Sequence, residues 1–159
     1  MILVLLGTFT IEFKRPLVEI EKLCAEGKLT EEIIVQNGHT KFSSPHFKMF
    51  PFIQPDLLDQ LYDKARIIIT HAGTGSIIKG LKKGKKIIAI ARLEKKGEHI
   101  DDHQLEILNE FARSGYILPW HESDDLEQVL QKVNNFTPKV YNSQKEKILN
   151  FLQNYIDSL

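Results

Sequence analysis

The chain has 159 residues, 21 basic and 21 acidic side chains, and one cysteine. This length predicts a single domain, residues 1–159, with a hydrophobic core of its own. The balanced charge excludes the strong positive field that recruits nucleic acid, and the single cysteine excludes an internal disulfide framework.

Short apolar strands alternate with amphipathic helices along the chain. The first strand is expected over 2–6, and it lacks the preceding basic segment of a signal peptide. An apolar stripe at helical spacing over 12–26 ends at Gly27 and includes Cys24, for which a buried packing role is expected. Further strands are expected over 33–36, 47–51, 66–71, 86–91 and 116–119. Helices are expected from Pro55 to Ala65, over 101–114 and from Leu126 to Val133.

This alternation predicts an α/β fold, a Rossmann-like doubly wound parallel sheet. Ile67-Ile68-Ile69 and Ile87-Ile88-Ala89-Ile90 are continuously apolar, as is typical of parallel strands covered on both faces. Ligands of such sheets bind at the carboxyl ends of the strands. No segment is long enough to span a bilayer, so a soluble, cytoplasmic chain is expected.

A glycine-rich turn follows the strand expected over 66–71. Gly73-Thr74-Gly75-Ser76 lies between this strand and a helical segment that begins at Ile77. Free amides and the positive end of the helix dipole attract anions at such a turn, which favours a phosphate or diphosphate. The turn has neither P-loop spacing nor the third glycine of G-x-G-x-x-G, and similar turns occur without any ligand.

A second polar cluster follows the strand expected over 86–91. The connection 92–106 contains one arginine, two histidines, several carboxylates and a glutamine, which is too polar for a core segment. Arg92 is a candidate partner for a phosphate, and His103, Gln104 and Glu106 are candidates for hydrogen bonds to hydroxyl groups.

The last helix, expected over 140–159, has an unusually wide apolar surface. Its apolar residues are Ile148, Leu149, Phe151, Leu152, Tyr155, Ile156 and Leu159. A helix with one buried face needs a narrower stripe, so the pattern fits either deep packing against the domain or contact with another protein.

Four segments of the chain carry a family resemblance. They are Gly7-Thr8, Gln36-x-Gly38, Thr70-His71-Ala72-Gly73-Thr74-Gly75-Ser76, and Arg92 with Gly97-Glu98-His99-x-Asp101-x-His103-Gln104. In this order and spacing they resemble the C-terminal domain of glycosyltransferase family 28. The likeness is to its stand-alone form, which occurs in bacterial capsular and exopolysaccharide transferases and in the eukaryotic UDP-N-acetylglucosamine transferase of asparagine-linked glycosylation.

The resemblance implies the donor-binding, C-terminal half of a GT-B glycosyltransferase. Transfer would be inverting and would need neither a tightly bound metal nor another cofactor. The implied partners are a UDP-sugar donor, a membrane-associated acceptor-binding subunit and a lipid-linked saccharide acceptor. The chain would then lie at the inner face of the plasma membrane through its partner. Whether the isolated chain forms a homodimer is left open.

The resemblance also assigns roles to individual residues. Gly73, Thr74, Gly75 and Ser76 would cradle the diphosphate, and His71 would donate to a phosphate oxygen. Gln36 and the backbone near Phe52 and Ile53 would lie by the uracil. Further contacts to sugar hydroxyls or phosphates would come from Thr8, Arg92, Glu98, His99, His103 and Gln104. The general base is expected on the partner, and residues 140–159 are expected to help dock it.

One position departs from the family pattern. The related murein-precursor transferase holds the ribose with a glutamate in the helix after the glycine turn, and Lys79 stands at the matching position here. Ribose recognition by that carboxylate is therefore not expected, and Lys79 is instead placed to approach a phosphate.

The same residues also allow structural roles without a ligand, and functions of other classes. His99 and His103 stand four residues apart near two aspartates, but no third histidine is placed for a metal site. Lys82-Lys83-Gly84-Lys85-Lys86 reads as a solvated turn or, alternatively, as a surface for anionic lipid. A non-catalytic enhancer subunit stays an alternative function. A dinucleotide-dependent oxidoreductase would need an acidic residue where Gln36 stands.

Overall fold

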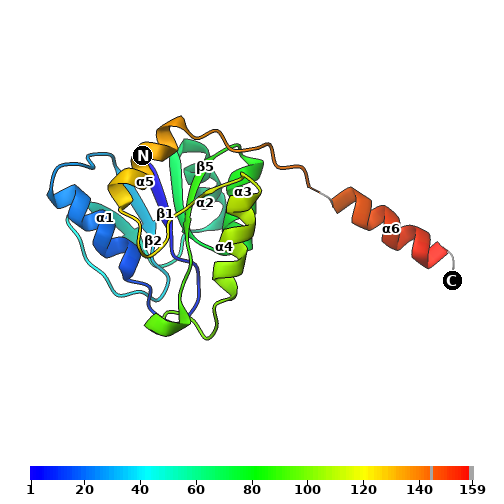
Figure 1. The fold of residues 1–159 in the computed structure, drawn as a ribbon, viewed down its shortest axis with the longest axis horizontal. Coiled ribbons are helices and arrows are strands. Elements are labelled where there is room, and N and C mark those ends of the chain that lie inside the picture. Colours follow the sequence, from blue (N-terminus) through cyan, green and yellow to red (C-terminus); the bar gives the residue numbers. More distant parts are fainter. Residues whose placement is uncertain (144, 158–159) are drawn as a thin grey trace.

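The structure is a computed structural model that describes residues 1–143 and 145–157, except for the side chain of residue 148. Six strands form one sheet in the order β3-β2-β1-β4-β5-β6, and every pairing is parallel (Figure 1). The strands are β1 (Ile2–Leu5), β2 (Ile33–Gln36), β3 (Phe47–Phe50), β4 (Ile67–His71), β5 (Lys86–Ile90) and β6 (Leu118–Pro119). The predicted doubly wound parallel sheet is thus confirmed.

Helices connect most successive strands, except β2 and β3, and two further helices follow β6. The helices are α1 (Arg15–Ala25), α2 (Pro55–Lys64), α3 (Thr74–Lys82), α4 (His103–Arg113), α5 (Leu126–Asn135) and α6 (Lys145–Asp157), with a short 3-10 helix η1 (Glu94–Lys96). Proline stands in the first turn of α1 and of α2, where its missing N–H costs no hydrogen bond. α3 begins earlier than expected, because Thr74, Gly75 and Ser76 form its first turn and do not precede it.

Alternate strand residues face opposite layers of helices. Val4, Ile69 and Ile88 belong to the core beneath α1 and α5, whereas their neighbours Leu3 and Ile68 belong to the core beneath α2, α3 and α4. Both faces of the central strands are therefore buried, as the continuous apolar runs predicted. Cys24 lies in the α1 core, in the packing role expected for it.

The strand order reverses between β1 and β4. The chain leaves β1 for α1 on one face of the sheet, and it leaves β4 for α3 on the other face. In doubly wound sheets, ligands bind at the carboxyl ends of strands whose connections diverge in this way. The Gly7 turn and the Gly73 turn lie at these two strand ends, with the His71 ring between them.

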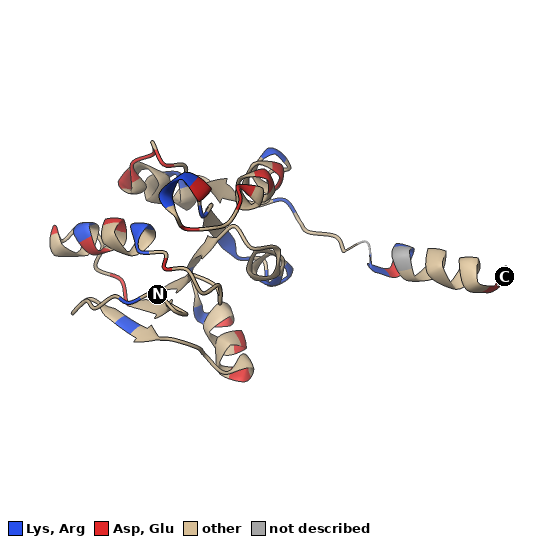
Figure 2. Cartoon of the chain, turned by 90° about the horizontal axis from the view of Figure 1, so that it is seen from below, with Lys and Arg blue, Asp and Glu red and all other residues tan. Residues whose placement is uncertain are grey.

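α6 stands apart from the α/β domain (Figure 1). Its Leu149, Phe151, Leu152 and Ile156 are all exposed, with Phe151 69% accessible. Between residues 149 and 156 the helix carries no charged side chain (Figure 2). The expected deep packing against the domain is not seen for the described part of this helix, and Leu159 lies outside the described residues. Among the described helices, none has the length and apolarity to cross a bilayer.

Candidate functional site

The amino end of α3 lies at the carboxyl end of β4. Gly73 is the N-cap and has no capping side chain, and the first intrahelical hydrogen bond joins Ile77 N to Gly73 O. The amides of Thr74, Gly75 and Ser76 are therefore free donors, and Thr74 and Gly75 are exposed. A β-carbon added to Gly75 would meet nothing within 4 Å, so the space beside Gly75 in this first turn is open. The arrangement is a helix N-terminus that accepts an anion.

The imidazole of His71 lies between the two glycine turns. A β-carbon at Gly7 would approach the His71 ring to 2.8 Å, and one at Gly73 would also clash with Nε2. Gly7 further has a φ of 78°, in the left-handed region. Both positions therefore need glycine for this ring to lie between them.

The protonation of His71 is set by its surroundings. Its Nδ1 lies 3.3 Å from the carbonyl oxygen of Leu5. Burial lowers the pKa of the imidazole below its ordinary value, and the charges of Arg92 and His99 lower it further, against the opposing effect of the Leu5 hydrogen bond. The free protein therefore holds a neutral His71 at neutral pH.

Gln36 organises the region expected to receive the uracil. Its Oε1 accepts a hydrogen bond of 3.1 Å from Ile53 N, which ties the end of β2 to the loop after β3. Ile53 is buried and Phe52 is exposed, with its ring in edge contact with His39. Phe52 and the unused amide group of Gln36 thus border the same loop.

Arg92 is enclosed in the protein and not open to a phosphate. Its side chain is 1% accessible, and its guanidinium donates to the carbonyl oxygens of Ile11, Glu98 and Leu6 at 2.6, 3.0 and 3.0 Å. Burial lowers its pKa to about 10, against the effect of Glu98, so it stays charged at neutral pH. The structure gives Arg92 the role of holding the β1–α1 loop against the β5–α4 loop, in place of the phosphate pairing expected from sequence.

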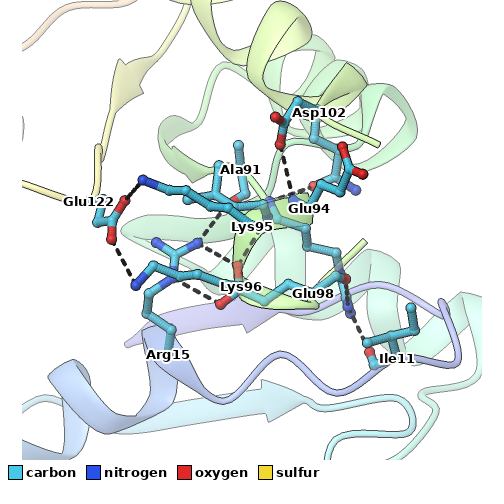
Figure 3. A network of polar contacts seen from close by, with 12 residues as sticks. Ile11, Arg15, Ala91, Glu94, Lys95, Lys96, Glu98, Asp102 and Glu122 are labelled. Carbon is cyan, nitrogen blue, oxygen red and sulfur yellow. Dashed lines mark hydrogen bonds and ion pairs between the residues drawn. The ribbon is translucent and has the colours of Figure 1, made fainter. Parts of the chain in front are cut away.

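Glu98 and Gln104 are likewise enclosed by contacts within the protein. The Glu98 carboxylate accepts two hydrogen bonds from Arg15, at 2.9 and 2.7 Å, and a third from Leu93 N (Figure 3). Gln104 Oε1 accepts from Arg92 N at 3.1 Å. Both side chains therefore shape the β5–α4 loop, and the contacts leave little of either for a sugar hydroxyl.

His99 and His103 keep more accessible positions on that loop. The His99 ring stacks on Phe9 with a centroid distance of 4.6 Å, and its Nδ1 lies 2.9 Å from Asp101 Oδ1. His103 begins α4, is exposed, and lies 3.4 Å from Glu106. Among the described residues, no three metal-binding side chains come together to hold an ion.

Several of the lysines considered for anion or lipid contact are engaged within the chain. Lys79 lies 3.3 Å from Asp59 and over the ring of Tyr62. Lys83 pairs with Asp59 and Asp63, and Lys86 donates to the carbonyls of Val133 and Asn134. The contacts of Lys83 and Lys86 hold the turn between α3 and β5, whereas Lys82 is exposed.

The structure thus separates the sequence candidates into two groups. The candidates that are at least partly exposed near the carboxyl ends of the strands are Thr8, Gln36, Phe52, His71, Gly73, Thr74, Gly75, Ser76, His99 and His103, whereas Ile53, Arg92, Glu98 and Gln104 are buried. Sequence reasoning missed Phe9 and Arg15, which contact the β5–α4 loop from the other side. Neither carries a local pattern, since each contacts this part of the chain across more than 70 positions of the sequence.

A parallel sheet with a free helix N-terminus at its switch point is the architecture of a doubly wound α/β domain, and it resembles the C-terminal half of a GT-B glycosyltransferase. The sequence matches the glycosyltransferase family 28 C-terminal domain over residues 1–159, and the chain belongs to this family.

The curated relatives include subunits of one eukaryotic transferase. The UDP-N-acetylglucosamine transferase subunit ALG13 of Candida albicans is 28% identical over 113 residues, which are 71% of this chain and 37% of the relative. The human subunit of the same name is 32% identical over 76 residues, which are 48% of this chain and 6% of the relative. The chain therefore matches only a little over a third of the Candida protein.

Solved structures confirm the fold. The solution structure of ALG13 superposes with a TM-score of 0.58 and 17% identity, covering 91% of each chain. The crystal structure of Acinetobacter baumannii MurG gives a TM-score of 0.57 and 18% identity, covering 83% of this chain and 40% of that one. At these identities the likeness shows the arrangement of strands and helices, and it carries no statement about substrates.

Proposed function

We propose that this chain is the donor-binding, catalytic subunit of a two-component inverting glycosyltransferase. It binds a UDP-hexose and transfers the sugar to a lipid-linked acceptor that a membrane-associated subunit holds. The observation that carries the proposal is the set of free amides at Thr74, Gly75 and Ser76, opposite the Gly7 turn at the switch point of the sheet.

The accessible residues contact different parts of the donor. The amides of the first turn of α3 and the hydroxyls of Thr74 and Ser76 receive the diphosphate, and they stabilise the negative charge that grows as UDP leaves. Phe52 and Gln36 border the uracil. The sugar hydroxyls face Thr8 and the two histidines of the β5–α4 loop, His99 and His103.

The chemistry of the acceptor belongs to the partner. The general base that deprotonates the acceptor hydroxyl is placed on the acceptor-binding subunit, which closes over the carboxyl ends of the strands. The names of the ALG13 relatives make UDP-N-acetylglucosamine the first donor to test. The biological setting we propose is capsular or exopolysaccharide synthesis at the inner face of the plasma membrane.

A carboxylate placed on the first turn of α3 tests the proposal. Thr74→Glu puts a negative charge at the positive end of the helix, which adds about 0.3–1 kcal/mol to the stability of the free protein. The same charge repels a diphosphate, so we expect UDP-N-acetylglucosamine binding to fall at least tenfold while the melting temperature is kept or rises. Calorimetric titration and thermal unfolding measure the two effects on one sample.

Gln128→Glu is the matched control. Gln128 is exposed in the first turn of α5, so the substitution adds the same charge at another helix N-terminus. We expect it to leave donor binding unchanged. Unchanged binding by Thr74→Glu would contradict the proposed diphosphate site. Lost binding with full turnover of the reconstituted pair would instead support a non-catalytic enhancer subunit.

A further inference from the structure

The hydrogen bonds around His71 fix which ring nitrogen carries the proton. Nδ1 lies 3.3 Å from Leu5 O, and a carbonyl oxygen only accepts hydrogen bonds. The hydroxyl of Thr70 lies 3.3 Å from the same carbonyl oxygen and 3.4 Å from Nδ1, so Thr70 also has Leu5 O as an acceptor for its proton. Nδ1 therefore carries the hydrogen, and in the neutral ring Nε2 holds a lone pair.

Nε2 is the ring atom that faces the two glycine turns. Ring atoms including Nε2 would meet a β-carbon at Gly7 or at Gly73. Among the described residues, the enclosed side-chain nitrogen and oxygen atoms without a partner are Asn37 Oδ1 and Arg92 Nε. Nε2 makes no hydrogen bond to the described residues and is not one of these enclosed atoms, so it keeps contact with solvent.

A phosphate oxygen beside Nε2 would face a second hydrogen-bond acceptor and no donor. Phosphate oxygens and the neutral Nε2 are both acceptors, so they repel each other. Proton uptake by Nε2 turns the repulsion into a charge-assisted hydrogen bond. A switch of tautomer would cost the hydrogen bond from Nδ1 to Leu5 O and would leave Nδ1 only the hydroxyl of Thr70, 3.4 Å away, as a partner.

We infer that binding of the diphosphate of a nucleotide-sugar is coupled to the uptake of one proton from solvent by Nε2 of His71. The inference rests on the proposed function, because it takes the diphosphate at the amino end of α3 as given. The proton balance is simple: one proton enters from the buffer as the donor binds, and it returns to the buffer when UDP has left and Nδ1 alone keeps its hydrogen.

The described residues around His71 supply no negative charge in the free protein, and this favours the coupling of proton uptake to donor binding. From the β5–α4 loop, Arg92 and His99 oppose a charge on the ring in the free protein. The first turn of α3 contributes amide dipoles and no charged side chain, and Leu6, Gly7 and Thr8 after β1 are also uncharged. The donor diphosphate is thus the group that supplies negative charge, and opposite charge within a few ångströms favours protonation.

Calorimetry in buffers of different ionisation enthalpy measures the proton uptake. UDP-N-acetylglucosamine is the probe, because its diphosphate does not titrate near neutral pH, whereas the terminal phosphate of UDP does. At about pH 7 we expect net uptake approaching one proton per donor bound. At higher pH the affinity should fall by up to tenfold per pH unit. Long-range proton–nitrogen NMR should show a neutral His71 with Nδ1–H in the free protein and an imidazolium in the complex.

Two variants assign the proton. His71→Gln keeps a polar side chain without a titration, and we expect its proton uptake to vanish. His46→Asn removes an exposed histidine that precedes β3, the edge strand, and should keep the wild-type uptake. Donor binding without proton uptake, or a neutral His71 signal in the complex, would overturn this inference and leave the proposed function standing. No donor binding by the chain, alone or with its partner, would overturn both.

Discussion

Gly38 and Gly27 have similar left-handed backbones but different surroundings. Their φ angles are 56° and 68°. A β-carbon at Gly38 would clash with the carbonyl oxygen of Gly7, whereas one at Gly27 would meet nothing within 4 Å. The pair therefore separates the cost of the backbone conformation from the cost of the close approach.

We expect Gly27→Ala to lower the free energy of unfolding by about 1–2 kcal/mol, the cost of a left-handed alanine. Gly38→Ala should cost about 1–3 kcal/mol more, since backbone must move to relieve the clash. It should also weaken donor binding, because the Gly7 turn beside His71 is displaced. Urea unfolding and donor titration of both variants test this. Equal stability of the two variants would contradict the contact between the Gly38 and Gly7 turns.

The lowered pKa of His71 predicts the pH dependence of the free protein's stability. The unfolded chain protonates this histidine near its ordinary pKa of 6.5, and the folded chain does so only at lower pH. Between the two pKa values the unfolded state binds more protons, so stability is complete above 6.5 and declines as the pH falls below it, by up to about 1.4 kcal/mol per pH unit. Protonation of carboxylates such as Glu31, whose pKa is lowered by Arg66, destabilises the fold only below their ordinary pKa of 4.5.

His71→Gln should flatten the stability curve between those two values. Urea unfolding at a series of pH values measures the slope, with His46→Asn as the control that keeps it. A slope that survives in His71→Gln would show that another group titrates in this window. A saturating concentration of UDP-N-acetylglucosamine should reverse the sign of the His71 contribution, because the complex holds the protonated form.

At the scale of elements, the β5–α4 loop is held from three sides. Arg15 of α1 binds Glu98, Arg92 binds the carbonyl of Ile11, and Glu122 after β6 pairs with Lys95 and Lys96 (Figure 3). The loop that carries His99 and His103 is thus placed before any donor binds. Such preorganisation lowers the cost of ordering on binding.

Glu98→Gln should loosen this loop without unfolding the domain. The substitution removes the charge from the pair with Arg15 and weakens the acceptor of Leu93 N, which costs about 1–3 kcal/mol. We expect faster hydrogen exchange at the Leu93 amide and weaker donor binding. Glu110→Gln breaks the exposed pair with Arg113 and should cost less than about 1 kcal/mol, with no effect on the loop. Unchanged exchange at Leu93 would contradict the role given to Glu98.

The sequence predicts the elements better than it predicts the contacts between loops. The runs at Ile67 and Ile87 define buried strands because burial on both faces requires continuous apolar residues. The glycine turn before α3 is also local, and its free amides follow from helix geometry. Arg92 was expected at a phosphate because arginines pair with anions, and its sequence neighbours gave no sign of three carbonyls supplied by distant loops.

At the scale of the whole molecule, α6 is an arm with its own amphipathic surface. Leu149, Leu152 and Ile156 lie at i, i+3 and i+7 and are all exposed, while Asn150, Gln153 and Asn154 are polar. An exposed apolar helix outside the core marks a site of association with another protein. The two-component transferase that we propose supplies that protein, so we assign α6 to docking the acceptor-binding subunit.

Removal of residues 145–159 should therefore separate folding from assembly. The domain has its own core on both faces of the sheet, so we expect the melting temperature of the shortened chain to stay within about 2 °C of the full chain. Recovery of the co-expressed acceptor-binding subunit in a pull-down should fall at least tenfold. Leu152→Asp should reproduce the loss, because it places a charge on the apolar stripe. Asn154→Asp adds the same charge on the polar side and should bind normally, and undiminished recovery by the shortened chain would place the docking surface on the domain instead.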